Sequence, residues 1–358
     1  MKLLAGTRKG LFTLEGDGSS WEITDRQFIG DPVPMLLALP DQQQLFIVLG
    51  TGHFGTHLHR SIDNGKSFKE IGVPVYPEKP ESSDDPCPWS LEMIWSLESG
   101  HDGKLWAGTI PGGLFSSTDS GESWSLNETL WNRPGRREWF GGGYDWPGIH
   151  SICVNPVNQR ELTVALSVGG IYRTTDDGAT WNPCGEGLRA DYVPPDLAFE
   201  VDRQDPHRIV QCPAQPDHWW MQHHNGIWKS TDNCSSWTEV TDVTPSTFGF
   251  AVACHPADGN TAWFVPAVAD ESRYPVDGKM VVTKTTDGGK TFQQLRKGLP
   301  QSDAYDLVYR HCLEVCDKGE TLLMGSTTGN LWSSIDAGRS WQSISNHLPP
   351  ILCLRLLC

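Results

Sequence analysis

No segment of this 358-residue sequence is a run of apolar residues as long as the about 18 that a membrane-spanning helix requires. Residues 1–10 also lack the apolar core of a secretion signal. These absences predict a cytoplasmic protein with no membrane partner.

Basic residues are scarce. The chain has 28 lysines and arginines against 44 aspartates and glutamates, which gives a net charge of −16. Because such a surface repels a phosphate backbone, we expect no nucleic-acid partner.

Paired cysteine motifs are also missing. The ten cysteines form no CxxC pair and no zinc-finger spacing. Several fall inside predicted strands, which favours buried thiols in a reducing compartment over a disulfide framework; these are Cys153, Cys212, Cys254, Cys312 and Cys353.

Turn-forming and aromatic residues are abundant, and they are organised in a repeat. An octapeptide, Ser/Thr-x-Asp-x-Gly-x-Ser/Thr-Trp/Phe, which we name the Asp box, recurs along the chain. The six full copies are residues 61–68, 117–124, 174–181, 230–237, 285–292 and 334–341. The fourth has Cys234 at the glycine position, and a shortened seventh copy covers residues 16–21.

The final aromatic residues of the seven boxes recur at nearly constant intervals. They stand at positions 21, 68, 124, 181, 237, 292 and 341. Repeats of about 40–50 residues with four short strands are typical of propeller blades. The sequence therefore predicts an all-β fold, a seven-bladed β-propeller with four-stranded blades, as one domain over residues 1–358.

The residue types of the box suit a hairpin turn. Aspartate accepts hydrogen bonds from turn amides, and glycine adopts a conformation that is costly for other residues. We expect the final aromatic side chain to pack between neighbouring sheets. These are structural roles, so the box aspartates are not predicted to be catalytic.

The fourth unit shows the expected blade most clearly. Its four strands are predicted at residues 149–154, 161–166, 170–174 and 180–183. The chain begins with a second strand, residues 2–6, and ends with an unpartnered strand, residues 351–357. This last strand should complete the first blade, so loss of the final eight residues should destabilise the fold.

The chain resembles bacterial BNR-repeat, or sialidase-like, propeller proteins. The segments that carry the resemblance are residues 6–12, 52–55, 139–145, 187–191, 223–226 and 347–350. The resemblance implies the propeller fold over nearly the whole chain. It does not extend to the sialidase reaction, because sialidases are six-bladed and carry an Arg-Ile-Pro motif that this sequence lacks.

Long loops lie away from the predicted boxes, at residues 73–89, 127–147, 188–206 and 267–277. Their arginines, aromatics and carboxylates suit a polar, sugar-like or carboxylated ligand. The alternative is that they are solvated loops without a ligand.

Several titratable residues are predicted at or just before the first strand of their blades, or in loops at the same edge. The candidate catalytic residues are Glu92, His150, His207, His224, Asp270 and Glu271. The candidate substrate-binding residues are Arg8, His53, Tyr144, Arg273, Tyr274, Arg310 and His311.

Three interpretations of the histidines stay open. His150, His207 and His311 could hold a divalent metal, the one cofactor that the sequence suggests. The imidazoles could instead act as general acid and base. They could also only form hydrogen bonds along a channel.

The segment 270–274 likewise has two interpretations. Asp270 and Glu271 beside Arg273 and Tyr274 could supply an acid or base and an anchor for an anionic substrate. The alternative is a surface ion pair.

Two classes of function follow from these residues. One is a hydrolase or lyase acting on a small polar substrate, a saccharide or sugar acid, with Arg273 and Arg310 holding a carboxylate. The other is a non-catalytic binding or protein-interaction propeller, since the fold does not determine the function.

Overall fold

The computed structural model describes residues 1–357, so Cys358 lies outside the described residues. It contains seven four-stranded antiparallel sheets and a single four-residue α-helix, α1 (Glu128–Trp131). The predicted fold class, an all-β seven-bladed β-propeller, is confirmed. None of the helices in residues 1–357 has the length and apolar character needed to cross a membrane.

The chain divides into two compact units, which are described separately. The unit formed by residues 1–34 and 207–358 contains the sheets β28–β1–β2–β3, β16–β17–β18–β19, β20–β21–β22–β23 and β24–β25–β26–β27. Their strands are β1 (Lys2–Thr7), β2 (Gly10–Gly16), β3 (Trp21–Gln27), β16 (Pro206–Cys212), β17 (Gln215–His223), β18 (Gly226–Ser230), β19 (Thr238–Val240), β20 (Gly249–His255), β21 (Asp258–Pro266), β22 (Val282–Thr285), β23 (Gln293–Leu295), β24 (Leu313–Val315), β25 (Leu322–Gly325), β26 (Leu331–Ser334), β27 (Gln342–Ser345) and β28 (Ile351–Leu357).

The unit formed by residues 35–206 contains the sheets β4–β5–β6–β7, β8–β9–β10–β11 and β12–β13–β14–β15. Their strands are β4 (Met35–Leu39), β5 (Gln44–Gly50), β6 (Thr56–Ser61), β7 (Lys69–Ile71), β8 (Met93–Ser99), β9 (Leu105–Ile110), β10 (Leu114–Ser117), β11 (Ser125–Leu126), β12 (Gly148–Val154), β13 (Leu162–Ser167), β14 (Gly170–Thr174) and β15 (Asn182–Pro183). The strands predicted for the fourth unit match β12 to β15 within two residues at each end.

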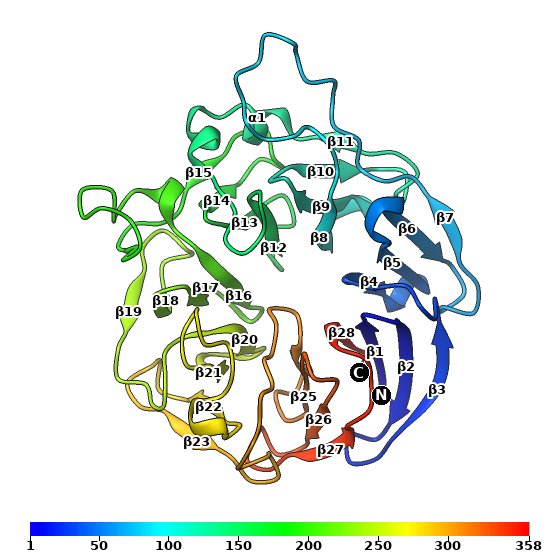
Figure 1. Cartoon of the computed structure of the whole chain (residues 1–358), viewed down its shortest axis with the longest axis vertical. Coiled ribbons are helices and arrows are strands. Elements are labelled where there is room, and N and C mark those ends of the chain that lie inside the picture. The colour runs from blue at the N-terminus through cyan, green and yellow to red at the C-terminus, as the bar shows by residue number, and fades with distance from the viewer. Residues whose placement is uncertain (358) are drawn as a thin grey trace. The chain divides into compact units, whose positions relative to one another are not determined.

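Pairing of the two chain ends is also confirmed. Strand β28 lies antiparallel beside β1, with Leu3 opposite Leu356 and Ala5 opposite Leu354. Strand β28 (red) and strand β1 (dark blue) lie side by side in Figure 1. The first sheet therefore takes its innermost strand from the end of the chain.

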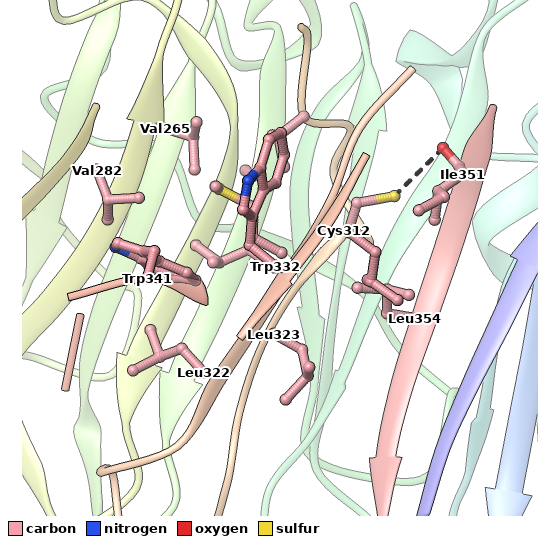
Figure 2. Packing of buried hydrophobic residues seen from close by; sticks show 14 of the residues in the cluster. Val265, Val282, Cys312, Leu322, Leu323, Trp332, Trp341, Ile351 and Leu354 are labelled. Atoms are coloured by element: carbon pink, nitrogen blue, oxygen red, sulfur yellow. Dashed lines mark hydrogen bonds between the residues drawn. The ribbon is translucent and has the colours of Figure 1, made fainter. Parts of the chain in front are cut away.

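The largest buried cluster shows why β28 is held in place. Ile351 and Leu354 are fully buried, and they pack with side chains of the neighbouring sheet such as Leu323 and Trp332. Figure 2 shows Cys312 directed at Ile351, whose carbonyl accepts a hydrogen bond from the Cys312 Sγ at 3.6 Å. Burial of apolar surface is the main stabilising contribution at this position.

The cysteines behave largely as expected. None of the nine within residues 1–357 forms a disulfide bond, and eight of them are buried. Cys153 is the half-buried exception.

Each full Asp box forms the same hydrogen-bonded turn between the third and fourth strands of its sheet. In the box at 174–181, the Asp176 carboxylate accepts hydrogen bonds from the hydroxyls of Thr174 and Thr180, both at 2.7 Å. It also accepts the Thr180 amide at 2.9 Å, while the Thr174 hydroxyl accepts the Gly178 amide at 2.9 Å. One carboxylate thus closes the hairpin, as the residue types predicted.

The glycine of the box has a conformational role. Gly178 has a φ of 87°, in the left-handed region that favours glycine. In the fourth box, Cys234 occupies the same position with a φ of 66° and still donates its amide to Ser230, at 3.1 Å. The turn therefore persists where the glycine is lost.

The hydrogen bonds lower the pKa of the box aspartates. For Asp176, bonds from the Thr174 and Thr180 hydroxyls lower the pKa from 3.8 to about 2. The pKa values of Asp119 and Asp287 also fall to about 2. The largest cause is the hydrogen bond from the hydroxyl near the end of each box, that of Ser123 or Thr291. Since the folded-state pKa is depressed, each contribution to stability is present above about pH 4 and is lost as the pH falls towards 2.

We predict that Asp176→Asn lowers the denaturation midpoint at neutral pH, because a side-chain amide has one accepting oxygen where the carboxylate has two, and so cannot keep all three hydrogen bonds. Urea unfolding from pH 7 to pH 2 tests this. The difference from wild type should be largest above pH 4 and should shrink towards pH 2. Asp242→Asn, an exposed aspartate outside the boxes, is the control. A difference that does not change with pH would contradict the assigned role.

Candidate functional site

The antiparallel order gives each sheet two different edges. The box turns lie at the edge where the third strand ends. The first strand begins at the opposite edge, where the turn between the second and third strands also lies. The sequence-predicted residues all occupy that opposite edge of their own sheets, or the loops entering it: Arg8, His53, Glu92, Tyr144, His150, His207, His224, Asp270, Glu271, Arg273, Tyr274, Arg310 and His311.

In the unit with residues 207–358, His207 is the second residue of β16 and is buried. Its Nδ1 lies 2.6 Å from the carbonyl oxygen of Gly249. A carbonyl can only accept, so Nδ1 carries a proton, and in the neutral imidazole the lone pair is then on Nε2. That tautomer suits a general base or a metal ligand.

His224 lies in the turn between β17 and β18, and its ring is 5.6 Å from that of His207 in an edge-to-face contact. Ligand atoms of the two imidazoles lie within 4.8 Å of each other. Asp205 stands two residues before His207 in the chain. Imidazole is a ligand that zinc uses in proteins, so His207 and His224 fit as two ligands of a divalent cation.

Phe250 on β20 is the centre of the same group. The His207 ring stacks on it at 4.4 Å with an interplanar angle of 10°. The guanidinium carbons of Arg273 and Arg310 lie 5.2 Å and 5.1 Å from its centroid. Two positive charges beside one buried aromatic ring can attract an anion.

Arg310 and His311 are both buried, just before β24. The carbonyl of His311 accepts the amide of Leu354, so this histidine also anchors the terminal strand. The Arg310 guanidinium is thereby brought to Phe250.

The loop 270–274 contains the ion pair that one interpretation anticipated. Arg273 donates from Nη2 to the Asp270 carboxylate at 2.5 Å, and both side chains are partly exposed. Tyr274 contacts Tyr305, with ring centroids 6.1 Å apart. Glu271 is exposed. Asp270 therefore orients Arg273, whose guanidinium also reaches Phe250.

In the unit with residues 35–206, both ring nitrogens of His150 are engaged. Nε2 lies 2.7 Å from the carbonyl oxygen of Pro206, and Nδ1 lies 2.9 Å from the Ser151 hydroxyl. His150 is fully buried. This geometry favours a hydrogen-bonding role over metal ligation.

Glu92 and Asp145 are two exposed carboxyl groups that interact electrostatically, and we call them the carboxyl pair. Partial desolvation raises the pKa of Glu92, and the negative charge of Asp145 raises it further. The Tyr144 ring lies 5.0 Å from that of Trp95, at the start of β8. A carboxyl group with a raised pKa keeps its proton to a higher pH than an ordinary glutamate, which suits a proton donor.

The remaining two candidates, Arg8 and His53, are exposed in turns between second and third strands. The Arg8 amide bonds to the Pro350 carbonyl, at 2.9 Å. His53 contacts Phe54, with ring centroids 3.9 Å apart. Neither is brought to another candidate residue within its own unit.

Sequence reasoning did not single out Phe250 or Trp95. Both lie near the start of a first strand, two or three residues into it, where an aromatic side chain is indistinguishable from an ordinary core residue in the sequence. In the sequence, Asp145 is one of the carboxylates of the loop 127–147 and has no feature that sets it apart.

Two of the long loops are fixed by buried charges. Arg136 pairs with Asp85, and both are buried. The Trp89 indole nitrogen also donates to Asp85, at 2.9 Å, and the Arg136 guanidinium lies 4.0 Å from the Trp131 ring centroid. Although burial alone would raise the pKa of Asp85, these hydrogen bonds lower it below its ordinary value. The segments 73–89 and 127–147 are therefore tied together.

The third long loop is tied down in a similar way. Asp202 accepts hydrogen bonds from Arg133 and Tyr172, and from the Trp139 indole at 2.9 Å. The Arg133 guanidinium lies 4.3 Å from the Tyr172 ring centroid. These loops are thus ordered by interior polar contacts.

The chain matches no family model, so the BNR or sialidase-like assignment is not confirmed. A curated relative, the probable oligoxyloglucan-reducing end-specific xyloglucanase of Neosartorya fischeri, is 26% identical over 172 residues. The match covers 45% of this chain and 19% of that protein.

Solved structures support the fold. The GH74 xyloglucanase of Xanthomonas campestris is similar with a TM-score of 0.65 and 15% identity, over 96% of this chain and 52% of that one. YCF48 bound to D1 peptide is similar with a TM-score of 0.56 and 17% identity, over 93% of this chain and 89% of that one. This chain thus spans about half the length of the xyloglucanase.

We predict that Arg136→Ala destabilises the protein by about 3–5 kcal/mol, because it leaves the Asp85 carboxylate buried without its cation. Arg137→Ala is the matched control. Arg137 pairs with the exposed Asp84, so its loss should cost less than about 1 kcal/mol. Chemical denaturation of both variants measures the two costs, and equal costs would contradict the role given to the buried pair.

Proposed function

We propose that this chain is a glycoside hydrolase-like protein that binds and cleaves a saccharide or sugar acid. Glu92 would be the proton donor, and Asp145 its partner carboxylate. The observation that carries this proposal is the raised pKa of the exposed Glu92, to which the charge of Asp145 contributes. The ring contact between Tyr144, which precedes Asp145, and Trp95, three residues after Glu92, links the same two segments.

Two carboxyl groups with different protonation states are what glycoside hydrolysis needs. One must be protonated to donate to the leaving oxygen, while the other stays ionised as base or nucleophile. Mutual repulsion separates two carboxyl pKa values in this way. The xyloglucanases among the similar proteins add support for a saccharide substrate, though at low identity.

The group around Phe250 has a separate role in this proposal. Arg273 and Arg310 would hold a carboxylate or oxyanion of an acidic ligand. His207, with its lone pair on Nε2, would act with His224 as acid and base or as ligands of a divalent cation.

A non-catalytic, peptide-binding propeller is the second candidate. The observation that favours it is the length match with YCF48, whose structure has a bound D1 peptide and of which this chain covers 89%. In that case the carboxyl pair would have no effect on any saccharide, and a peptide would bind instead.

We predict that Glu92→Gln reduces hydrolysis of oligosaccharides by about 100- to 10,000-fold, the usual contribution of a general acid. Aryl glycosides with good leaving groups need less protonation, so their loss should be much smaller. Wild-type activity should fall as the pH rises through the raised pKa of Glu92, because only the protonated carboxyl group can donate. Initial rates on neutral and acidic oligosaccharides, xyloglucan fragments included, measure all three effects.

Glu78→Gln is the matched control, since Glu78 is exposed and lies outside the carboxyl pair. If Glu92→Gln loses as much activity on aryl glycosides as on oligosaccharides, Glu92 is not the general acid. An absence of hydrolysis on every substrate, together with saturable peptide binding, would favour the second candidate.

The role of the His207 group has its own test. We predict that a zinc-supplemented and dialysed protein retains about one equivalent of metal if the imidazoles are ligands, and that His224→Gln loses it. Elemental analysis measures this. If wild type and variant both retain no metal, the interpretation of the histidines as metal ligands is wrong. The acid–base interpretation is then tested by the hydrolysis rate of the His207→Gln variant.

A further inference from the structure

A pair of hollows lies beside the tied loops, in the unit with residues 35–206. They have volumes of about 470 Å³ and 430 Å³. Trp89, Trp131 and Asn132 line both of them. They therefore form one groove that continues past the Trp89 indole, and neither hollow includes Glu92, Tyr144 or Asp145.

The Trp89 indole is held in a fixed position. Its nitrogen donates to Asp85, which is itself paired with Arg136, and its ring meets that of Trp131 edge to face at 5.5 Å. Trp89 is only half-buried, so part of its surface is open to the groove. An aromatic surface that is already rigid loses little entropy when a ligand packs on it.

Polar groups surround this aromatic surface. Glu128 and Asn132 are exposed on and just after α1, and neither side chain forms a hydrogen bond or ion pair within residues 1–357. Ser125 lines the same hollow, whereas Ser83 and Arg137 line the other one. A carboxylate and an amide can each engage neighbouring hydroxyl groups.

We propose that this groove is a binding site for a neutral oligosaccharide, separate from the carboxyl pair. A sugar ring has an apolar face and a rim of hydroxyl groups. The apolar face matches the Trp89 indole, and the hydroxyl groups match Glu128 and Asn132. A polar-lined groove of this volume exceeds the needs of a single small ion and suits a ligand of several sugar units.

Calorimetric titration of the full chain with cellotetraose tests the site, with tetragalacturonate as the acidic counterpart. We expect the Glu128→Gln/Asn132→Ala double variant to bind cellotetraose at least about ten-fold more weakly. Neither side chain contributes to packing, so this variant should fold normally, and a thermal melt checks it. Trp89→Ala should lose binding, whereas Trp89→Phe should retain most of it.

Glu78→Gln, outside both hollows, should bind as wild type does. Unchanged affinity in the double variant would overturn the site. Weaker binding of a peptide, but not of cellotetraose, in the same variant would overturn the choice of ligand.

This inference and the proposed hydrolysis can fail separately. If cellotetraose binding is lost in a Glu92→Gln/Tyr144→Ala variant but not in the groove variants, the groove is wrong and the carboxyl site stands. If no saccharide is hydrolysed but the groove variants lose cellotetraose, the groove stands and the proposed reaction is wrong.

Discussion

The carboxylate of each Asp box is the contact on which the rest of every complete blade depends. A single aspartate accepts two hydroxyls and at least one amide, and so closes the turn that returns the chain for the fourth strand. The fourth strands are short, with only two residues in β11 and β15. Since so few ladder bonds cannot hold a strand alone, the turn and the aromatic residue after it supply the rest.

The aromatic residue links neighbouring sheets. The Trp124 indole donates to the carbonyl of Gly72 at 3.0 Å, and the Trp181 indole donates to the Asn127 side chain at 2.9 Å. The boxes at 117–124 and 174–181 thus close their own blades and contact the previous one. The same repeat that makes the fold predictable therefore explains how consecutive blades within a unit are joined.

The local parts of the fold were predictable because they depend on neighbouring residues. The box turn needs an aspartate, two hydroxyls and a residue that tolerates positive φ, and all of these lie within eight positions. The pairing of β28 with β1 was also predictable. The first predicted blade lacks its first strand, and one predicted strand remains after the last blade. Leu354 and Ala5 then pair across the full length of the sequence.

The candidate site was less predictable because its chemistry depends on contacts across the fold. His150 and His207 occupy similar positions in their strands, yet their hydrogen-bond partners differ: His150 contacts the Pro206 carbonyl and the Ser151 hydroxyl, and His207 donates from Nδ1 to the Gly249 carbonyl. Nothing in the residue pattern separates these two environments. Likewise, the sequence gives no sign that Asp85 and Arg136, in different loops, form a buried pair.

The buried pair also changes how the long loops are understood. A loop that serves only as a solvated connection does not require a carboxylate and a guanidinium in its interior, because removing both from water costs several kcal/mol. Here that cost is offset by a hydrogen bond from the Trp89 indole and by the contact of Arg136 with Trp131. The result is a rigid segment with a half-exposed indole at its surface. A loop that only connects two strands gains nothing from a rigid, half-exposed indole. Ligand binding does gain from it, because the conformational entropy of the Trp89 side chain is already lost on folding and is not lost again on binding.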